Sequence, residues 1–255
     1  MIVQAAGRRI DAQWFPARDP GMPTLVFLHE GLGSVGLWRD VPHALAQLTG
    51  FSALVYSRYG NGRSQVLEAP REVRYMHDEA ILALPEVLAH FQVERPLLVG
   101  HSDGASIALL YAAAFPERVV GIVAEAPHVF VEDVSVRSIA AIGEEYRSGS
   151  LRARMARHHD DVDATFFGWN DIWLRPDFFA WNIVPILKRL AAPVLCIHGS
   201  QDEYGTLAQL ETIEREVPGI VDRLVLDRCG HSPHRDRASV VLPMLASWAL
   251  AVVGP

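Results

Sequence analysis

A serine between two glycines stands where an expected strand gives way to an expected helix. The motif reads Gly100-His101-Ser102-Asp103-Gly104, with the apolar run 97–99 before it and the helix-forming run 105–114 after it. In this context a sharp turn projects the serine hydroxyl, and flanking glycines avoid clashes with neighbouring chain. The helix start also points backbone N–H groups at a negative charge formed nearby. Ser102 is therefore predicted to be a nucleophile.

The histidine best placed to activate Ser102 is His231. A serine hydroxyl is a weak nucleophile until a base removes its proton. Among the eleven histidines, His231 follows the apolar run 224–226, in a loop whose side chains can reach back over a sheet. His234 is a nearby alternative, and His101 is expected to pack at the turn.

An acid that orients the base should lie between serine and histidine in chain order. Asp202 follows the buried-strand pattern 194–198, at the position where such an acid is expected. The alternative for Asp202 is a purely turn-forming aspartate. Glu203 could serve in its place, and so could Glu125, which follows the preceding apolar run 119–124.

Two backbone N–H groups are needed to hold the oxyanion that forms when Ser102 attacks a carbonyl. The first is expected from Asp103, the residue after the nucleophile. The second is expected from the glycine-rich loop His29-Glu-Gly-Leu-Gly-Ser34, with Gly31 the first choice and Leu32 the next. A plain strand-to-helix turn without this role is the alternative for the loop.

The elements around these residues follow the rhythm of an α/β protein. Short apolar runs such as 24–29, 53–57 and 194–198 alternate with stretches of helical spacing such as 38–48 and 76–91. Alternation of this kind predicts a mostly parallel sheet covered by helices on both faces. A turn is expected over residues 19–23, and Gly50 is expected to end the helix that precedes it.

Residues 128–190 break this rhythm, because they contain no comparable strand-like run. A plain loop of this length between two core strands would be unusual. We therefore expect a helical cap at 128–190 on a core formed by 1–127 and 191–255. The aromatic residues of this segment are Phe166, Phe167, Trp169, Trp173, Phe178, Phe179 and Trp181. Of these, Phe166, Trp169, Trp173 and Trp181 are predicted to face a substrate, the alternative being that they only attach the cap to the core.

We call the turn at residues 100–104 the nucleophile elbow. This elbow, the acid Asp202 and the histidine His231 together resemble those of the α/β-hydrolase superfamily, and the resemblance covers nearly the whole chain. The loop Arg58-Tyr-Gly-Asn-Gly-Arg-Ser64 is similar to the Arg-Gly-x-Gly-x-Ser loop of its capped, small-substrate branch. This resemblance implies a sheet of about eight strands, a cap after the sixth strand, no cofactor, and hydrolysis through an acyl-serine intermediate.

The nature of the nucleophile narrows the reaction. With serine at the elbow, the resemblance implies hydrolysis of an ester, thioester or lactone, or of a carbon–carbon bond beside a carbonyl as in meta-cleavage product hydrolases. Those hydrolases usually carry a Trp after the catalytic histidine, where this chain has Ser232. Glu30 and Asp103 adjoin the expected oxyanion donors, and Glu30 is predicted to be a substrate-binding residue. Their charges would oppose an anionic substrate group. A neutral ester is therefore favoured, and a non-catalytic binder of small apolar ligands is the alternative from another class.

Charge and composition exclude several other functions. The net charge of −7 argues against nucleic acid, and the two cysteines are too few for a disulfide framework. Neither an export signal nor a membrane-spanning run is evident, so a cytoplasmic protein with a small-molecule substrate is expected, with homodimer formation left open. The cluster 158–163 is read as a solvated helix end rather than a metal site, and Arg152, Arg154 and Arg157 as a solvated face.

Overall fold

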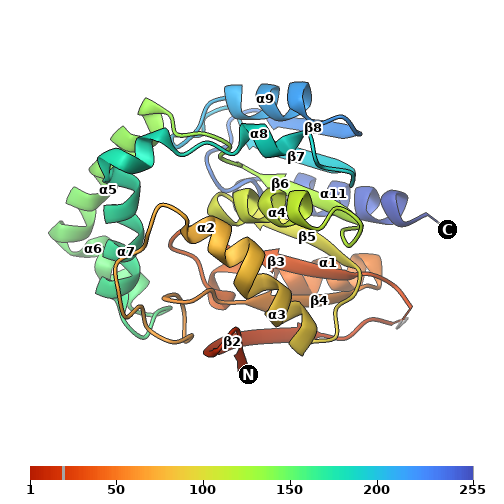
Figure 1. The fold of residues 1–255 in the computed structure, drawn as a ribbon, viewed down its shortest axis with the longest axis horizontal. Helices are drawn as coiled ribbons and strands as arrows, with labels where there is room; N and C mark the ends of the chain where they lie inside the picture. The colour runs from red at the N-terminus through yellow and green to blue at the C-terminus, as the bar shows by residue number, and fades with distance from the viewer. Residues whose placement is uncertain (19–20, 255) are drawn as a thin grey trace.

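A computed structural model describes residues 1–18 and 21–254 of the chain; Asp19 and Pro20 of the expected turn lie outside the described residues. Its centre is a sheet of eight strands in the order β1-β2-β4-β3-β5-β6-β7-β8 (Figure 1). The strands are β1 (Ile2–Ala5), β2 (Arg8–Phe15), β3 (Thr24–Leu28), β4 (Ser52–Tyr56), β5 (Pro96–His101), β6 (Gly121–Glu125), β7 (Val194–Gly199) and β8 (Val221–Leu226). Only β2 pairs antiparallel, with β1 and β4, so the predicted mostly parallel sheet is confirmed.

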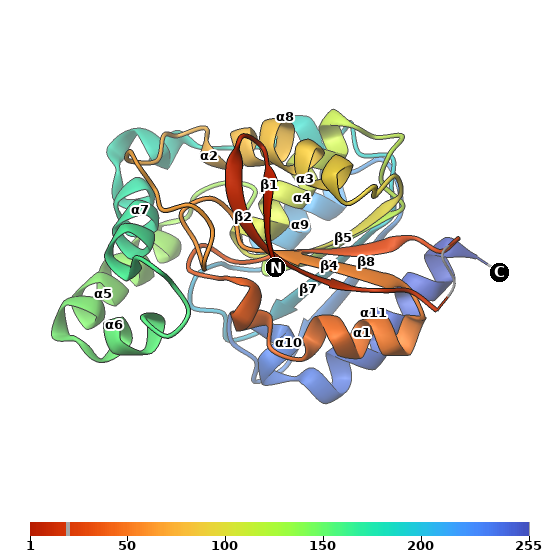
Figure 2. The ribbon, with the colours of Figure 1, turned by 90° about the horizontal axis from the view of Figure 1, so that it is seen from below.

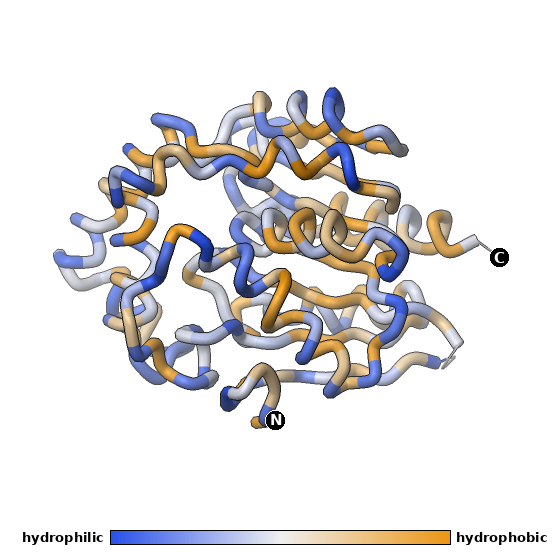
Figure 3. Tube along the Cα trace, viewed as in Figure 1, coloured by the Kyte–Doolittle hydropathy of each residue, from blue (hydrophilic) through white to orange (hydrophobic). Residues whose placement is uncertain are grey.

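Burial explains why the central strands are apolar throughout. Every residue of β3, β4, β5, β6 and β7 is buried, as expected for parallel strands that helices cover on both faces. The edge strand β8 differs, because only its last residue, Leu226, is buried. Figure 3 shows the same contrast between apolar central segments and polar outer loops.

Helices cover both faces of this sheet, and Figure 2 shows the two layers edge-on. One face carries α1 (Val41–Thr49), α10 (Pro233–Asp236) and α11 (Ala238–Val253). The other carries α2 (Tyr75–Asp78), η2 (Glu79–Ala83), α3 (Leu84–His90), α4 (Asp103–Ala114), α8 (Val184–Leu187) and α9 (Ala208–Glu216). Among the described residues, no helix is both long and apolar enough to cross a membrane.

Two predicted helices differ in detail from the structure. The segment expected to be helical at 38–48 begins instead with a 3-10 turn, η1 (Val35–Trp38), and α1 follows after a break. Arg39 causes this break, since its φ of +52° is incompatible with a continuing right-handed helix. Gly50 caps α1 with a φ of +76°, as predicted. The segment 76–91 is helical but contains the π turn η2 between α2 and α3.

The chain between β6 and β7 forms the outlying helices at the left of Figure 1. It contains α5 (Asp133–Ser148), α6 (Ser150–Met155), α7 (Val162–Leu174), η3 (Pro176–Ala180) and α8. Its only β pairing in the part of the chain that the structure describes is an isolated bridge between Phe130 and Asn182. Because α8 packs against α4 and α9, the chain has already returned to the core by residue 184. We call α5, α6 and α7 the cap helices.

Candidate active site

Ser102 lies on a strained turn between β5 and α4. Its φ of +55° and ψ of −119° are rarely adopted by a non-glycine residue, and its N–H donates to Glu125 O at 2.9 Å. The flanking glycines are required by close packing. A Cβ on Gly100 would lie 2.4 Å from Gly104 O, and one on Gly104 would lie 1.9 Å from Leu28 O. The turn therefore fits between β3 and β6 only with glycine at both flanks.

His231 and Asp202 meet in the loops that follow β8 and β7. Nδ1 of His231 lies 2.8 Å from each carboxylate oxygen of Asp202. Asp202 Oδ1 also accepts the N–H groups of Tyr204 at 2.8 Å and Gly205 at 3.3 Å, which fix the carboxylate. Burial alone would raise the pKa of Asp202, but the hydrogen bond from His231 and the neighbouring His198 lower it to about 2. The carboxylate is thus ionised and oriented toward the imidazole.

The structure places the two alternative acids elsewhere. Glu125 Oε2 lies 2.6 Å from His234 Nδ1, and both side chains are buried beside the turn that carries Ser102. Glu203 contributes its backbone oxygen to a hydrogen bond from Ser138 Oγ, and no bond joins its carboxylate to His231 among the described residues. Asp202 is therefore the one of the three acids that contacts the predicted base.

His101 connects the elbow to the loop of His231. Its Nε2 donates to His231 O at 2.6 Å, while its Nδ1 lies 3.7 Å from Glu30 Oε2. Burial would lower the pKa of His101, but Glu30 raises it, which favours an imidazolium with a proton on both nitrogens. His101 thus not only packs at the elbow, as predicted, but also binds the loop of His231 by a hydrogen bond.

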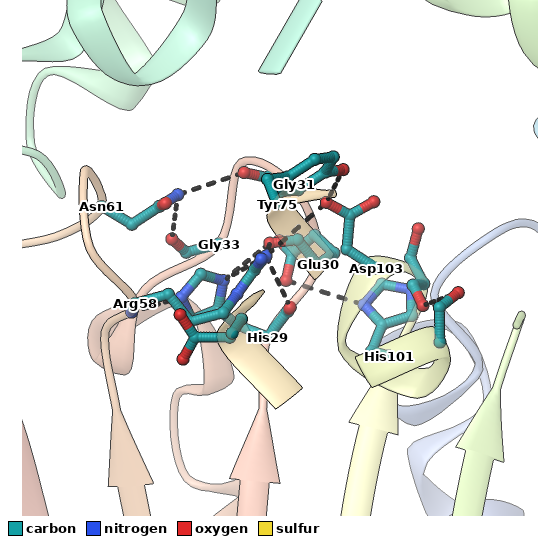
Figure 4. Close-up of polar contacts among 12 residues, drawn as sticks. His29, Glu30, Gly31, Gly33, Arg58, Asn61, Tyr75, His101 and Asp103 are labelled. Carbon is teal, nitrogen blue, oxygen red and sulfur yellow. Dashed lines mark hydrogen bonds and ion pairs between the residues drawn. The ribbon is translucent and has the colours of Figure 1, made fainter. Parts of the chain in front are cut away.

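The loop 29–34 is held from below by two side chains of the loop 58–64, as Figure 4 shows. Arg58 donates to His29 O at 3.1 Å and Glu30 O at 2.9 Å, and Asn61 donates to Gly31 O and Gly33 O, both at 3.1 Å. The C=O and N–H of a trans peptide point in opposite directions. With these carbonyl groups bound on one side, the N–H groups of Gly31 and Leu32 face the other side, where both residues line the pocket.

Asp103 is oriented by residues from other elements (Figure 4). Its Oδ2 accepts from Tyr75 Oη at 2.6 Å and lies 3.8 Å from Arg58, and the side chain is only 1% exposed. Trp173 Nε1 in turn donates to Tyr75 Oη at 3.0 Å. A cap helix thereby supports the residue whose backbone N–H is the first expected oxyanion donor.

A cavity of about 210 Å³ contains Ser102 and His231. Larger cavities, of about 320 and 560 Å³, flank residues 67–71 and contain none of the predicted catalytic residues. Of the predicted binding residues, Glu30, Trp169 and Trp173 line the 210 Å³ cavity. Residues that line it without having been predicted are His128, Ile139, Ile142, Tyr204, Ser232 and Arg235. Helix α5 contributes Ile139 and Ile142 to the lining and α7 contributes Trp169 and Trp173, so these two helices share the cavity with Ser102.

Phe166 and Trp181 do not line this cavity, and their predicted substrate contacts were wrong. Phe166 is fully buried and stacks on Tyr146 with ring centroids 3.7 Å apart, inside the cap. Trp181 stacks on Phe178 at 5.7 Å, where the chain returns to the core. Both rings bury their area against protein neighbours. Trp181 belongs to the core cluster and fits the alternative interpretation, attachment of the cap to the core, whereas Phe166 joins the cap helices to one another.

These features agree with the comparisons with known proteins. A family model for the alpha/beta hydrolase fold matches residues 23–175. The chain belongs to the alpha/beta hydrolase fold family. A 2-succinyl-6-hydroxy-2,4-cyclohexadiene-1-carboxylate synthase of Enterobacter sp. (strain 638) is 31% identical to this hydrolase-fold chain, over 90% of the chain and 93% of the relative.

Solved structures share the hydrolase fold at lower identity. The enol-lactonase from Burkholderia xenovorans LB400 matches with a TM-score of 0.76 and 16% identity, over 97% of this chain and 99% of that chain. The 2-hydroxy-6-oxo-6-phenylhexa-2,4-dienoate hydrolase from Rhodococcus sp. strain RHA1 matches with a TM-score of 0.77 and 20% identity, over 97% and 98%. The predicted superfamily and fold class are thereby confirmed.

One residue of this hydrolase-fold chain was misjudged from sequence. His159, expected on a solvated helix end, is 6% exposed; its Nδ1 accepts from Gly62 N at 2.9 Å and its Nε2 donates to Leu32 O at 3.0 Å. Burial lowers the pKa of His159 to about 4, which fits this neutral tautomer. His159 therefore ties the cap to the oxyanion loop. In the part of the chain that the structure describes, no group of three or more His, Cys, Asp or Glu side chains is arranged to hold a metal ion.

The arginines of the cap remain on its surface. Arg152 makes a two-pronged ion pair with Asp163, and Arg154 pairs with Glu145 at 2.8 Å. All four side chains are about half exposed and none of them lines the cavity of Ser102. The structure thus agrees with the interpretation of this group as a solvated face.

Proposed function

We propose that this protein is a serine hydrolase that cleaves a small, neutral carboxylic ester, thioester or lactone through an acyl-serine intermediate. One observation carries the proposal: His231, oriented by Asp202 at 2.8 Å, shares a cavity with Ser102 on its strained turn. This is the arrangement of nucleophile, base and orienting acid that acyl transfer requires.

In the proposed reaction His231 Nε2 takes the proton of Ser102 as the hydroxyl oxygen attacks the carbonyl carbon. The N–H groups of Asp103 and of Gly31, with Leu32 adjacent, stabilise the oxyanion. His231 then gives its proton to the leaving oxygen, and Asp202 keeps the imidazole in the tautomer with Nδ1–H. Water, activated by the same histidine, releases the acid and restores Ser102.

The size and walls of the cavity support a small substrate without its own charge. A volume of about 210 Å³ leaves room for a small acyl or alcohol part. Leu32, Ile139 and Ile142 with Trp169 and Trp173 offer apolar contact area. The carboxylate of Glu30 opposes an anionic group close to the oxyanion donors.

A second candidate comes from one of the sequence relatives. The synthase with 31% identity is named after a compound that contains carboxylate groups. Arg235 lines the cavity and makes no ion pair among the described residues, so it offers a cation for a carboxylate distant from Glu30. Hydrolysis of a carbon–carbon bond in such a substrate would use the same serine and histidine.

A substrate panel tests the proposal and separates the candidates. The panel contains short p-nitrophenyl esters, thioesters, lactones, a meta-cleavage dienoate and the substrate of the synthase. Turnover of a neutral ester, together with labelling of Ser102 by a fluorophosphonate probe, is expected. Exclusive turnover of a carboxylate-bearing substrate would favour the second candidate, and ligand binding without any turnover would favour a non-catalytic binder.

A further inference from the structure

Glu30 places a charge in an otherwise mainly apolar part of the active-site cavity. Its side chain is 26% exposed and lines the cavity together with Leu32, Ile139 and Trp169. Asp103, the other carboxylate at the oxyanion donors, is enclosed at 1% exposure and accepts from Tyr75. Of these two carboxylates, Glu30 is the one that a substrate can reach.

The loop is built to hold the Glu30 carboxylate in this place. A Cβ on Gly33 would lie 2.3 Å from Glu30 Oε2, so the side chain folds over a residue that must lack one. His101 Nδ1 lies 3.7 Å from the same oxygen, an ion-pair distance longer than a hydrogen bond. Burial alone would raise the pKa of Glu30, but His101 lowers it well below its ordinary value. The carboxylate is therefore ionised beside the reaction centre.

The protein itself uses little of the hydrogen-bonding capacity of this carboxylate. A carboxylate accepts about four hydrogen bonds, and leaving a partly buried charge without them is costly. In the part of the chain that the structure describes, no group of another residue comes within hydrogen-bond distance of its two oxygens. A hydrogen-bond donor on the bound substrate would replace water as the partner of a Glu30 carboxylate oxygen.

We propose that the substrate is a hydroxy ester whose hydroxyl, two to four bonds from the scissile carbonyl carbon on the acyl or the alcohol side, donates to Glu30. This inference rests on the proposed hydrolysis. The position follows from the chain, because Glu30 directly precedes the N–H groups of Gly31 and Leu32 that would hold the carbonyl oxygen. A neutral hydroxyl fits better than an ammonium group, since His101 already supplies the cation paired with Glu30.

Matched pairs of esters test this assignment. One pair compares a 2-hydroxyacyl ester with the acyl ester that lacks the hydroxyl; a second pair places the hydroxyl on the alcohol, as a 2-hydroxyethyl ester against a propyl ester. The measured quantity is the ratio of kcat/KM within each pair for the wild type, Glu30→Gln and Glu30→Met. Dividing the wild-type ratio by the variant ratio cancels the intrinsic reactivity of the esters.

We expect at least one pair to lose its hydroxyl preference on the order of tenfold or more in Glu30→Met, as for loss of a hydrogen bond to a charged group, and less in Glu30→Gln. Glu94→Gln, at an exposed carboxylate before β5, should keep the wild-type ratio. Unchanged ratios in both Glu30 variants for both pairs would overturn the assignment. A larger Glu30-dependent preference for a 2-aminoacyl ester than for the 2-hydroxyacyl ester would also overturn it.

The same compounds distinguish failure of this inference from failure of the proposed hydrolysis. If the wild type cleaves none of the esters, the hydrolase proposal fails. Calorimetric titration of Ser102→Ala with each pair then tests Glu30 by binding alone. Tighter binding of the hydroxy ester that Glu30→Met abolishes supports the assignment, and equal binding of both members overturns it.

Discussion

On one side of Ser102, which we call the proton side, Asp202 and His231 come from loops after neighbouring strands and contact each other directly at 2.8 Å. On the other side, which we call the oxyanion side, the loop 29–34 makes few contacts of its own. Arg58 and Asn61 from a distant loop hold its carbonyl groups. The proton side is thus assembled from two short segments, and the oxyanion side from several distant ones.

The cap segment from His159 to the end of α7 belongs to the second of these sides, whereas α5 binds the loop of Asp202 through Ser135 and Ser138. His159 donates to Leu32 O, and the ring of Trp169 lies directly against Gly31. No cap helix contacts Asp202 or His231 by a hydrogen bond among the described residues. A change at His159 or in α7 should therefore disturb oxyanion stabilisation and substrate binding while leaving the proton-transfer pair in place.

The largest effect is expected from Ser102→Ala, because the proton side acts on its hydroxyl and the oxyanion side acts on the intermediate that this hydroxyl forms. Turnover should fall on the order of 10⁴-fold or more, since no other group can form the acyl intermediate. The variant should melt like the wild type and escape labelling by a fluorophosphonate. Retention of even a tenth of the wild-type rate would show that Ser102 is not the nucleophile. The comparison of a proton side with an oxyanion side would then lose its basis.

Asp202→Asn should break the proton side alone. The amide favours the wrong imidazole tautomer, so kcat should fall by about 10³-fold, somewhat less than for loss of the serine. Labelling of Ser102 should slow in parallel. Glu203→Gln serves as the matched control, because its carboxylate makes no bond to His231, and it should keep the wild-type rate within about twofold.

The oxyanion side and the proton side should lose their contributions to stability over different pH ranges in unfolding experiments. His159 has a pKa lowered by burial to about 4, so its contribution is complete above its ordinary pKa near 6.5 and is lost as the pH falls toward 4. That loss corresponds to about 3 kcal/mol of unfolding free energy. Asp202, with a pKa of about 2, loses its contribution only below its ordinary range near 3.8.

Denaturant titrations between pH 4 and pH 7 measure this dependence. The wild type should lose stability across the range, and His159→Gln should lose markedly less, because the protonatable ring has been removed. Equal slopes for the two proteins would mean that His159 is not held neutral in the folded state. The link it makes between cap and oxyanion loop would then be in doubt.

Asn61→Asp should weaken the oxyanion side without changing the size of the side chain. Aspartate keeps the acceptor for Arg71 but loses the amide donor to Gly31 O and Gly33 O. We expect kcat to fall by about 100-fold with little change in KM, as for loss of an oxyanion donor. Asn182→Asp, at an exposed residue that acts through its acceptor oxygen, should leave kcat unchanged.

The smallest effect is expected in the cap. Trp173→Ala should raise the KM for an aromatic ester roughly tenfold more than the KM for an acetate ester. This factor corresponds to the loss of about 50 Å² of apolar contact. Phe166→Ala is the matched control: its ring stacks on Tyr146 rather than lining the cavity, so it should lower the melting temperature and change both KM values equally. Equal KM changes in Trp173→Ala would make it another attachment residue.

The sequence was sufficient for the sheet and for the contact between Asp202 and His231, because each residue follows a buried strand in a fixed chain order. It was insufficient for the oxyanion side. Asn61 lies 30 residues from Gly31, and His159 lies 97 residues from Gly62, so only the tertiary structure brings these partners together. A polar side chain in a loop gives no signal of which distant carbonyl group it will bind.

The aromatic residues of the cap show that sequence analysis has the same limit for residues close together in the chain. Trp169 and Phe166 both lie on α7, yet one lines the cavity and the other faces Tyr146 inside the cap. Apolar residues surround much of this helix, so periodicity alone does not identify the face that the substrate meets. Which face each ring occupies depends on α5, whose docking the sequence pattern did not determine.

The contact between Gly31 and Trp169 has a consequence for redesign of the enzyme. A Cβ at residue 31 would lie 2.0 Å from Trp169 Nε1, so any larger residue there needs a smaller one at 169. A larger residue at 31 is therefore blocked as a single change, whereas a smaller residue at 169 opens the space that it needs. Libraries that vary positions 31 and 169 together would reach substrate profiles that changes at position 31 alone do not.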